Sequence, residues 1–202
     1  MPAVVAASPG ERILDLCASP GGKTIAMASD MNDTGAIIAT DVRPRRLTLL
    51  RDTVQTAGVR CVSVAPVPTA GPLPFDARFD AVLVDAPCSG LGTVRRDPDI
   101  RWRRREEDLA AFARDQLALL MRAADVVRPG GRLVYATCSS EPEENDGVVA
   151  TFIKARSDFR GVDLRASAHA LLAPFIDRHG FFRTTPPAHG LEAFFAAVLT
   201  RV

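Results

Sequence analysis

The chain has 202 residues, a length within the range of one domain with a sizeable hydrophobic core. Its composition is 47% hydrophobic and 24% charged, and its net charge of +1 excludes a general electrostatic attraction to nucleic acid. No apolar run reaches the length of a membrane span, and residues 1–5 lack the basic and apolar regions of a secretory signal. We therefore expect a cytoplasmic protein that does not bind membranes.

The four cysteines are widely spaced along the chain, at Cys17, Cys61, Cys88 and Cys138. No pair has the CxxC spacing of a zinc or redox site, so we predict reduced thiols and no metal site. Whether any of these thiols is reactive then depends on where the fold places it, because reactivity requires the thiolate form.

Short apolar runs alternate with segments of helical periodicity. Strands are predicted at Arg12–Cys17, Ala36–Asp41, Cys61–Ala65, Phe79–Asp85 and Arg132–Thr137, each rich in the aliphatic residues of a sheet that is covered on both faces. Helices are predicted at Gly22–Met31, Pro44–Ala57, Glu106–Val127 and Glu143–Ala155, the third ended by Arg128-Pro129-Gly130-Gly131 and the last opened by a capping box of Ser140 and Glu143. This alternation predicts an α/β fold with a doubly wound, mostly parallel sheet.

The C-terminal part has a different pattern. Gly180–Thr184 and Ala193–Thr200 are predicted strands joined by a loop that contains Pro186-Pro187, which favours an antiparallel hairpin at the edge of the sheet. The stretch Pro66–Pro74, with four prolines and a glycine, is predicted to be an irregular loop.

The segment DLCASPGGKT follows the first predicted strand and opens a helix. Doubly wound sheets bind ligands at the carboxyl ends of their strands, and Gly21 and Gly22 let the backbone approach a ligand closely. The exposed N–H groups of the helix start favour an anionic group. Asp41 ends the second predicted strand, where a carboxylate suits hydrogen bonds to ribose hydroxyls. These features predict a nucleoside-containing cofactor at this rim.

Two other interpretations of this loop stay open. Gly22-Lys23-Thr24 matches the end of a phosphate-binding loop, although Cys17 stands where that motif has its first glycine. The strand Phe79–Asp85 then resembles the magnesium-holding strand of an NTPase. The glycines are also compatible with a turn that serves packing alone. The G-x-G-x-x-G pattern of a dinucleotide site is absent from the loop.

Cys88 and Cys138 each follow a predicted strand, in DAPCSG and ATCS. The ends of neighbouring parallel strands share one rim, so we expect both thiols and Asp85 to face one cleft, although a lone cysteine in a strand is usually a small core residue. Methylation of cytosine at carbon-5 needs such a set of groups. A thiolate adds to carbon-6 and makes carbon-5 nucleophilic, a carboxyl group serves N3, and a base removes the carbon-5 proton.

Four segments, DLCASPGGKT, ATDVRPRR, VLVDAPCSGLGTVRRDPDIRW and GGRLVYATCSSEPEEN, resemble the Nop/Sun family of RNA cytosine-5 methyltransferases, in particular its bacterial small-subunit rRNA (RsmB-type) members. The resemblance runs from about Gly10 to Ile153, with a weaker echo at Glu192–Leu199. It implies a Rossmann-like class I methyltransferase domain over residues 1–202, S-adenosylmethionine as cofactor, and RNA, rRNA in particular, as partner. Family members carry an upstream RNA-binding region, so we expect the domain to depend on such a region, absent from 1–202, or on a separate partner.

The resemblance also implies roles for individual residues. Cys138 is the expected nucleophile, Cys88 assists elimination and product release, and Asp85 contacts both the base ring and the cofactor. In DNA cytosine methyltransferases the nucleophile lies in the Pro-Cys motif instead, and that order exchanges the roles of the two cysteines. The implied cofactor-binding residues are Cys17, Ala18, Ser19, Pro20, Gly21, Gly22, Lys23, Asp41, Arg46 and Asp85.

Basic residues cluster directly after the Pro-Cys motif. Arginine supplies phosphate contacts and an indole offers a stacking surface, so we predict that this cluster contacts RNA. Asp97 and Asp99 offset part of the charge, which leaves a solvated loop as the alternative. The predicted RNA-binding residues are Arg95, Arg96, Arg101, Trp102 and Arg103.

Two positions depart from the family pattern. Family members carry an acidic residue after the third strand that contacts adenine, whereas residues 62–67 hold no carboxylate. The closing motif is Glu192-Ala193-Phe194-Phe195 in place of the usual Asp-Gly-Phe-Phe. The missing carboxylate, together with the missing upstream region, motivates an alternative function, namely a catalytically silent domain that binds RNA or a partner and keeps the fold.

Overall fold

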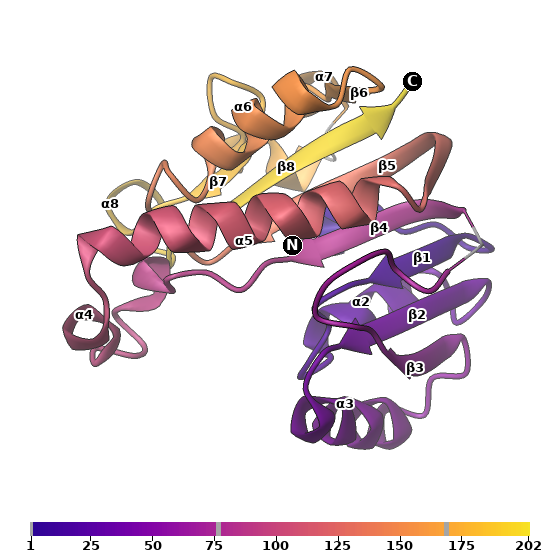
Figure 1. The fold of residues 1–202 in the computed structure, drawn as a ribbon. Coiled ribbons are helices and arrows are strands. Elements are labelled where there is room, and N and C mark those ends of the chain that lie inside the picture. The colour runs from indigo at the N-terminus through magenta and orange to yellow at the C-terminus, as the bar shows by residue number, and fades with distance from the viewer. Residues whose placement is uncertain (1, 76–77, 168–169) are drawn as a thin grey trace.

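A mixed eight-stranded sheet with helices on both faces forms the framework of the computed structural model, which describes residues 2–75, 78–167 and 170–202 (Figure 1). The strands are β1 Arg12–Asp15, β2 Ala36–Asp41, β3 Val62–Pro66, β4 Phe79–Asp85, β5 Val127–Thr137, β6 Phe159–Gly161, β7 Phe182–Thr184 and β8 Phe194–Arg201. Their order in the sheet is β3-β2-β1-β4-β5-β8-β6, and β7 also pairs with β8.

The first five strands are parallel, and the C-terminal strands are antiparallel to their neighbours. From β1 the chain proceeds outward to β2 and β3, and it then returns to form β4 on the other side of β1. The strand order therefore reverses between β1 and β4. In doubly wound sheets such a reversal opens a crevice at the carboxyl ends of the two strands, where ligands bind.

The helices are α1 Pro2–Val5, α2 Gly22–Asp30, α3 Pro44–Ala57, α4 Ile100–Arg103, α5 Glu106–Ala124, α6 Asp146–Ala155, α7 Leu164–Ser167 and α8 Pro186–His189, with 3-10 turns η1 Leu91–Thr93 and η2 Ala170–Phe175. Helices α5 and α6 pack on one face of the sheet, where α5 crosses in front of the strands in Figure 1. Helices α1, α2 and α3 and the segment around η2 cover the other face.

The alternation of side chains along β4 explains why both faces need a cover. Val82 and Val84 point into the core beneath α5 and α6, whereas Ala81 and Leu83 point into the core beneath α1 and α2. All four are fully buried. Successive side chains of a strand point to opposite faces, so a continuous apolar run is stable only in a sheet that is buried on both sides.

The predicted doubly wound α/β fold with a C-terminal antiparallel hairpin is confirmed. Strand β8 pairs with β5 from Arg132↔Thr200 to Thr137↔Phe195, and β7 pairs with β8 as the second strand of the predicted hairpin. The short strand β6, which pairs with the far end of β8, was not expected from the sequence. Three residues are too few to produce a periodic signal.

Two predicted boundaries are wrong. The long helix ends at Ala124 rather than Val127, because Val127 is buried and pairs with Phe79 of β4. The segment after it, predicted as a helix stop, is part of β5, and the Arg128 guanidinium lies 2.6 Å from an Asp80 carboxylate oxygen. The register between β4 and β5 shifts at this point, which is how the strand accommodates a proline and two glycines.

The predicted capping box of Ser140 and Glu143 is also wrong. Helix α6 begins at Asp146, three residues later than predicted, and its cap residue Asn145 makes no side-chain cap bond. The Ser140 hydroxyl donates to the neighbouring Glu141 carboxylate at 2.7 Å. Residues 142–145 instead form a turn, in which the side chains of Glu144 and Asn145 point inward, toward the ends of β4 and β5.

Candidate active site

The loop between β1 and α2 forms one wall of the crevice. The predicted first strand ends at Asp15 rather than Cys17, and residues 16–21 leave the sheet to form this loop. Gly21 has a φ of +113°, and a Cβ at this position would lie 2.9 Å from Leu50 Cδ1 of α3. The loop can therefore lie against α3 in this way only with glycine at position 21.

Two buried polar atoms of this wall have no hydrogen-bond partner among the described residues. Asp15 is fully buried, and its Oδ2 accepts a hydrogen bond from the Thr24 hydroxyl at 2.7 Å. Its other oxygen, Oδ1, and the Ser19 hydroxyl find no partner within residues 2–75, 78–167 and 170–202. Burial, with a further contribution from the Asp85 charge, raises the pKa of Asp15 to about 7. Unsatisfied buried polar atoms beside a crevice fit a bound polar cofactor.

Asp41 and Arg46 connect the end of β2 to this loop. Asp41 is almost fully buried, and one of its oxygens lies 3.3 Å from Arg46 Nε. The same guanidinium donates to the Ser19 carbonyl oxygen at 2.8 Å. Arg46 thus links the β1–α2 loop to the end of β2. The Asp41 carboxylate lies beside the predicted cofactor position.

The two strand-end cysteines meet in a single small cavity. Cys88 Sγ lies 3.2 Å from Cys138 Sγ, and Lys23 Nζ lies 2.6 Å from Asp85 Oδ2. All four line a cavity of about 250 Å³. Cys17, Ser19, Arg46, Ala86, Pro87, Arg96 and Phe194 complete its lining. The structure therefore brings the glycine loop, the carboxylate and both thiols together, as expected from the strand order.

The surroundings give the three thiols of this cavity different acidities. A hydrogen bond from the Cys88 thiol lowers the pKa of Cys138, and the charge of Lys23 acts in the same direction against burial and the Asp85 charge. That hydrogen bond and burial raise the pKa of Cys88. Burial also raises the pKa of Cys17 to about 12. Because the thiolate is the reactive form, Cys138 is the thiol whose reactivity this arrangement favours.

The geometry gives no support to the NTPase interpretation. A phosphate-binding loop offers its threonine hydroxyl to a magnesium ion and its lysine to phosphates. Here Thr24 is fully buried with its hydroxyl bonded to Asp15, and Lys23 forms an ion pair with Asp85. Both groups are already engaged within the protein.

The predicted RNA-binding residues are separated into two groups. Arg96 lines the cysteine cavity, and Arg95 donates to the Gly190 carbonyl oxygen at 3.1 Å beside it. The others lie on α4, where Trp102 is 77% exposed and the Arg101 guanidinium stacks over its ring at 4.9 Å. Arg103 is 3.6 Å from Asp99 in an exposed pair. The cluster therefore includes one residue of the cavity and three residues of α4, the short helix at a corner of the molecule in Figure 1.

Two contacts of the site had no signal in the sequence. Arg104 belongs to the basic run, yet its Nε donates at 2.8 Å to the carbonyl oxygen of Ser89, the residue that follows Cys88. Glu144 belongs to an acidic stretch that resembles a solvated helix start, but it is completely buried and bonded to the residues after both cysteines. Neither periodicity nor motif distinguishes an inward-pointing charge from an exposed one.

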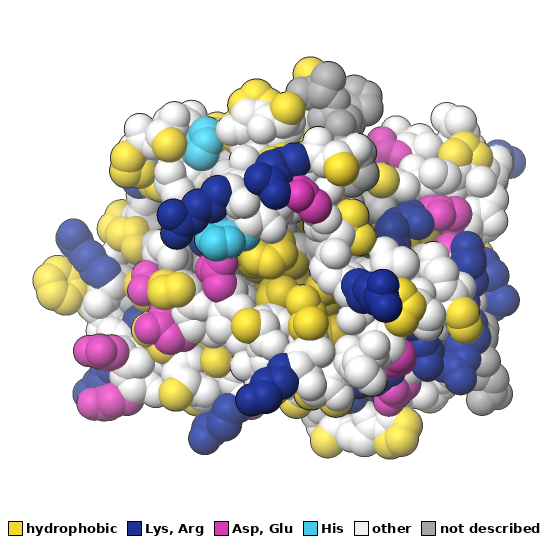
Figure 2. Space-filling model, turned by 90° about the horizontal axis from the view of Figure 1, so that it is seen from above, with side chains coloured by type: hydrophobic (Ala, Val, Ile, Leu, Met, Phe, Trp, Pro, Cys, Tyr) yellow, Lys and Arg dark blue, Asp and Glu magenta, His cyan; other side chains and the backbone are white. Residues whose placement is uncertain are grey.

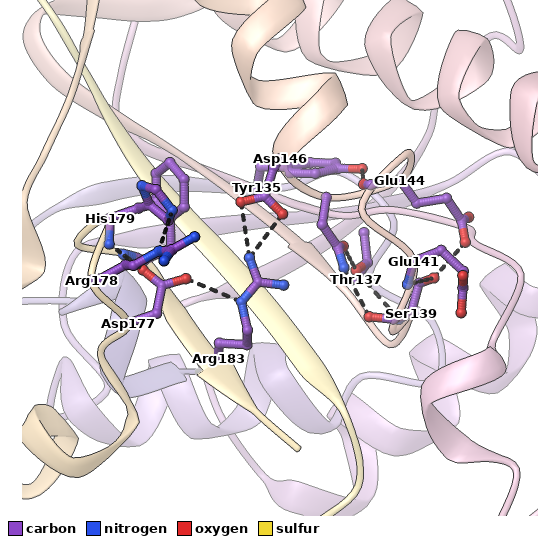
Figure 3. A network of polar contacts seen from close by, with 12 residues as sticks. Tyr135, Thr137, Ser139, Glu141, Glu144, Asp146, Asp177, Arg178, His179 and Arg183 are labelled. Atoms are coloured by element: carbon purple, nitrogen blue, oxygen red, sulfur yellow. Dashed lines mark hydrogen bonds and ion pairs between the residues drawn. The ribbon is translucent and has the colours of Figure 1, made fainter. Parts of the chain in front are cut away.

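A larger hollow, of about 890 Å³, lies between α6 and β7. Figure 2 shows hydrophobic side chains gathered on this side of the molecule, next to basic, acidic and histidine side chains. Its charged residues are paired with one another, since Arg183 lies 2.9 Å from Asp146 and 3.0 Å from Asp177 (Figure 3). We place the chemistry in the smaller cavity because that cavity holds the thiols.

Within the part of the chain that the structure describes, no helix has the length and apolar character of a membrane span.

Comparison with known proteins identifies the family of this chain. Residues 2–200 match the model of the 16S rRNA methyltransferase RsmB/F family. The chain is 34% identical over 188 residues to the probable ribosomal RNA small subunit methyltransferase B of Bacillus subtilis (strain 168), an alignment that covers 92% of this chain and 42% of the relative. It is 42% identical over 150 residues to the ribosomal RNA small subunit methyltransferase B of Enterobacter sp. (strain 638), covering 74% of this chain and 35% of the relative.

Among solved structures, NSun6 from Pyrococcus horikoshii with SFG, an analogue of S-adenosylmethionine, superposes on this chain with a TM-score of 0.86. The two are 30% identical, and the match covers 100% of this chain and 50% of that one. The chain spans about two fifths of the length of the curated relatives that it matches. With a family match over almost its whole length, this chain belongs to the 16S rRNA methyltransferase RsmB/F family.

Proposed function

We propose that the chain transfers a methyl group from S-adenosylmethionine to carbon-5 of cytosine in RNA, rRNA in particular, through a covalent adduct with Cys138. The observation that carries this proposal is the 3.2 Å separation of the Cys88 and Cys138 sulfurs in a cavity beside the glycine loop. Family membership supports methyl transfer to rRNA, and the paired thiols support the covalent route at carbon-5.

The crevice residues fit S-adenosylmethionine. The buried, unpartnered Asp15 Oδ1 and Ser19 hydroxyl offer hydrogen-bonding positions at the loop, and the Asp41 carboxylate suits ribose hydroxyls. Residues 17–23, Arg46 and Asp85 complete this proposed binding surface. When bound, the cofactor supplies an electrophilic methyl group on a sulfonium. The related NSun6 structure with SFG supports this assignment.

The proposed reaction begins when the Cys138 thiolate adds to carbon-6 of cytosine, and a carbon–sulfur bond forms. Asp85, on the cavity wall, donates from its protonated carboxyl group to N3 of the ring and favours the electron shift that makes carbon-5 nucleophilic. Carbon-5 then forms a bond to the methyl group, whose bond to the sulfonium sulfur would break to leave a neutral thioether. A base removes the carbon-5 proton, the electron pair re-forms the ring double bond, and the Cys138 sulfur leaves. Cys88, in contact with that sulfur, assists this elimination by donating a hydrogen bond to the departing Cys138 thiolate.

Alanine substitutions separate the two thiol roles. Cys138→Ala is expected to abolish methyl transfer, by at least ~1000-fold for loss of a nucleophile, while calorimetry detects unchanged binding of S-adenosylmethionine. Cys88→Ala is expected to accumulate a covalent RNA–protein adduct, visible as a slower band on a denaturing gel. Turnover by Cys88→Ala together with adducts in Cys138→Ala would reverse the assignment.

The modified base is identified by mass spectrometry of RNA incubated with the protein and isotopically labelled cofactor. The expected product is 5-methylcytosine, and label on another base contradicts the cytosine-5 proposal. A protein that fails to bind S-adenosylmethionine at millimolar concentration would favour a catalytically silent, RNA- or partner-binding domain instead.

A further inference from the structure

Glu144 is a buried carboxylate in the turn between β5 and α6, with 0% of its surface exposed. No lysine or arginine of the described residues forms an ion pair with it. Its oxygens are satisfied by four hydrogen bonds instead. Burying a carboxylate is strongly unfavourable unless such donors are held in place, so this part of the fold is built around the group.

The donors to this carboxylate come from the loops that carry the two cysteines. Oε2 accepts from the hydroxyls of Ser89 and Ser139, both at 2.5 Å, and Oε1 accepts from the Ser89 N–H at 2.9 Å. Ser89 directly follows Cys88, and Ser139 directly follows Cys138. The two hydroxyl oxygens lie 3.2 Å apart, as do the two sulfurs. One carboxylate therefore bonds to the residue after each cysteine.

Further contacts fix the carboxylate itself. The Gln116 side-chain amide of α5 donates to Glu144 Oε1 at 2.8 Å and to the Pro87 carbonyl oxygen at 3.1 Å, immediately before Cys88. The Tyr135 hydroxyl lies 2.6 Å from the Glu144 carbonyl oxygen and 3.0 Å from the Gln116 side-chain oxygen. Figure 3 shows Glu144 on the side of Ser139 and Thr137, away from the ion pairs of Arg183.

We propose that Glu144 is a positioning residue of the active site, whose carboxylate holds the Pro-Cys loop against the Thr-Cys loop and thereby sets the distance between the Cys88 and Cys138 sulfurs. This inference rests on the proposed function. Glu144 does not line the cavity and acts through the two serines. Since a misplacement of about 1 Å in a reacting group costs a factor of ~100 in rate, loosening this contact affects chemistry more than cofactor binding.

Glu144→Gln tests the proposal, because it keeps the shape of the side chain and replaces one acceptor oxygen by a donating amide. We expect kcat for RNA methylation to fall by ~10-fold or more, with an unchanged KM for S-adenosylmethionine. Alkylation of Cys138 by iodoacetamide, followed by mass spectrometry, is expected to require a higher pH, because Cys88 no longer donates to Cys138 at the same distance. A loss of stability alone does not move that pH profile in folded protein.

Asp146→Asn is the matched control. Asp146 begins α6 two residues later, and its carboxylate pairs with Arg183 rather than with either cysteine loop. This variant is expected to keep the wild-type kcat and alkylation profile, and an equal loss in both variants would overturn the proposal. Should Glu144→Gln fail to fold, Ser139→Ala removes one of the four donors and is expected to shift the alkylation profile in the same direction.

A folded Glu144→Gln or Ser139→Ala protein with the wild-type kcat and the wild-type alkylation profile overturns the positioning role. Absence of methyl transfer by the wild-type protein contradicts the proposed function instead. In that case the alkylation profiles still test whether Glu144 sets the distance between the sulfurs, because they need no RNA and no cofactor.

Discussion

The thiols of Cys88 and Cys138 differ in pKa because of one contact between them. At a sulfur–sulfur distance of 3.2 Å, the hydrogen bond between them lowers the pKa of one thiol and raises that of the other. The Lys23 charge favours the thiolate at Cys138. Because the hydrogen bond and the lysine act on the same sulfur, position in the cavity rather than residue type determines which thiol is the more acidic, and this supports Cys138 as the proposed nucleophile.

Asp15 is the residue at which pH is expected to act on stability. Its pKa is raised by burial to about 7 in the folded protein, against 3.8 when it is unperturbed. The folded state thus binds the Asp15 proton more tightly than the unfolded state does between these values. The contribution of Asp15 to stability is complete below about pH 4 and is lost as the pH rises through about 7.

Asp15→Asn removes this titration. We expect the stability of the wild type relative to the variant to fall by at most ~1.4 kcal/mol per pH unit between about pH 4 and 7. Urea unfolding of both proteins, without cofactor, at pH 5, 6, 7 and 8 measures the difference. A difference that stays constant over this range would show that Asp15 titrates at an ordinary pKa in the fold.

At the level of elements, the turn from β1 into α2 depends on the first of its two glycines. A residue with a side chain at position 21 would need the left-handed φ of +113°. Its Cβ would also lie 2.9 Å from the Leu50 side chain and 3.2 Å from the Thr53 side chain of α3. A Cβ at Gly22, at the start of α2, has nothing within 4 Å. The two glycines of the PGGK sequence therefore serve different purposes.

Gly21→Ala is expected to destabilise the protein by about 1–3 kcal/mol, from backbone strain and crowding against α3. Gly22→Ala, the matched control, is expected to be neutral or stabilising by up to about 1 kcal/mol, because alanine is the better helix residue. Urea midpoints at constant m-value measure both. Equal loss in the two variants would contradict the distinction drawn between them.

The bounds of the helices and strands show which parts of the fold could be predicted from the sequence. Strands such as Ala36–Asp41 and Phe79–Asp85 match their predicted bounds because a strand buried on both faces needs an uninterrupted apolar run. Val127 was assigned to a helix because its apolar spacing continues that of α5, and only its pairing with Phe79 places it in a strand. Local periodicity has no information on such a long-range partner.

The candidate site was predictable to a similar extent. The strand ends that bring Cys88, Cys138 and Asp85 into one cavity follow from the parallel order of the sheet. The Glu144 carboxylate was not predictable, because its burial depends on donors from loops that are 55 and 5 residues away in the sequence. The capping box at Ser140 was wrong for a related reason, since this segment turns its polar groups toward those loops.

Considered as a whole, the molecule carries almost no net charge but distributes its basic residues unevenly. The net charge is +1, whereas six arginines lie between positions 95 and 105. Arg96 of this group lines the cysteine cavity, and Arg101 and Arg103 lie on α4, where Trp102 is exposed. We therefore expect an RNA strand with its target base in the cavity to find phosphate contacts at these arginines and a stacking surface at Trp102.

Trp102→Ala is expected to weaken binding of a cytosine-containing single-stranded RNA by about 1–3 kcal/mol, which is ~5- to 150-fold in Kd, because a stacking surface is lost. Arg101→Ala is expected to reduce the slope of log Kd against log salt by about one, because one phosphate contact is removed. Fluorescence anisotropy titrations at several salt concentrations measure both quantities.

Arg60→Ala is the control for Arg101→Ala. Arg60 is 89% exposed and lies 3.2 Å from Asp33, directly before β3 and thus at the amino ends of the strands, on the opposite rim from the cavity. Its removal changes the net charge as Arg101→Ala does, but it is expected to leave both Kd and the salt slope unchanged. If Arg60→Ala and Arg101→Ala weakened RNA binding equally, overall charge rather than the position on α4 would determine affinity, since the two variants differ in the position of the lost charge and not in its size.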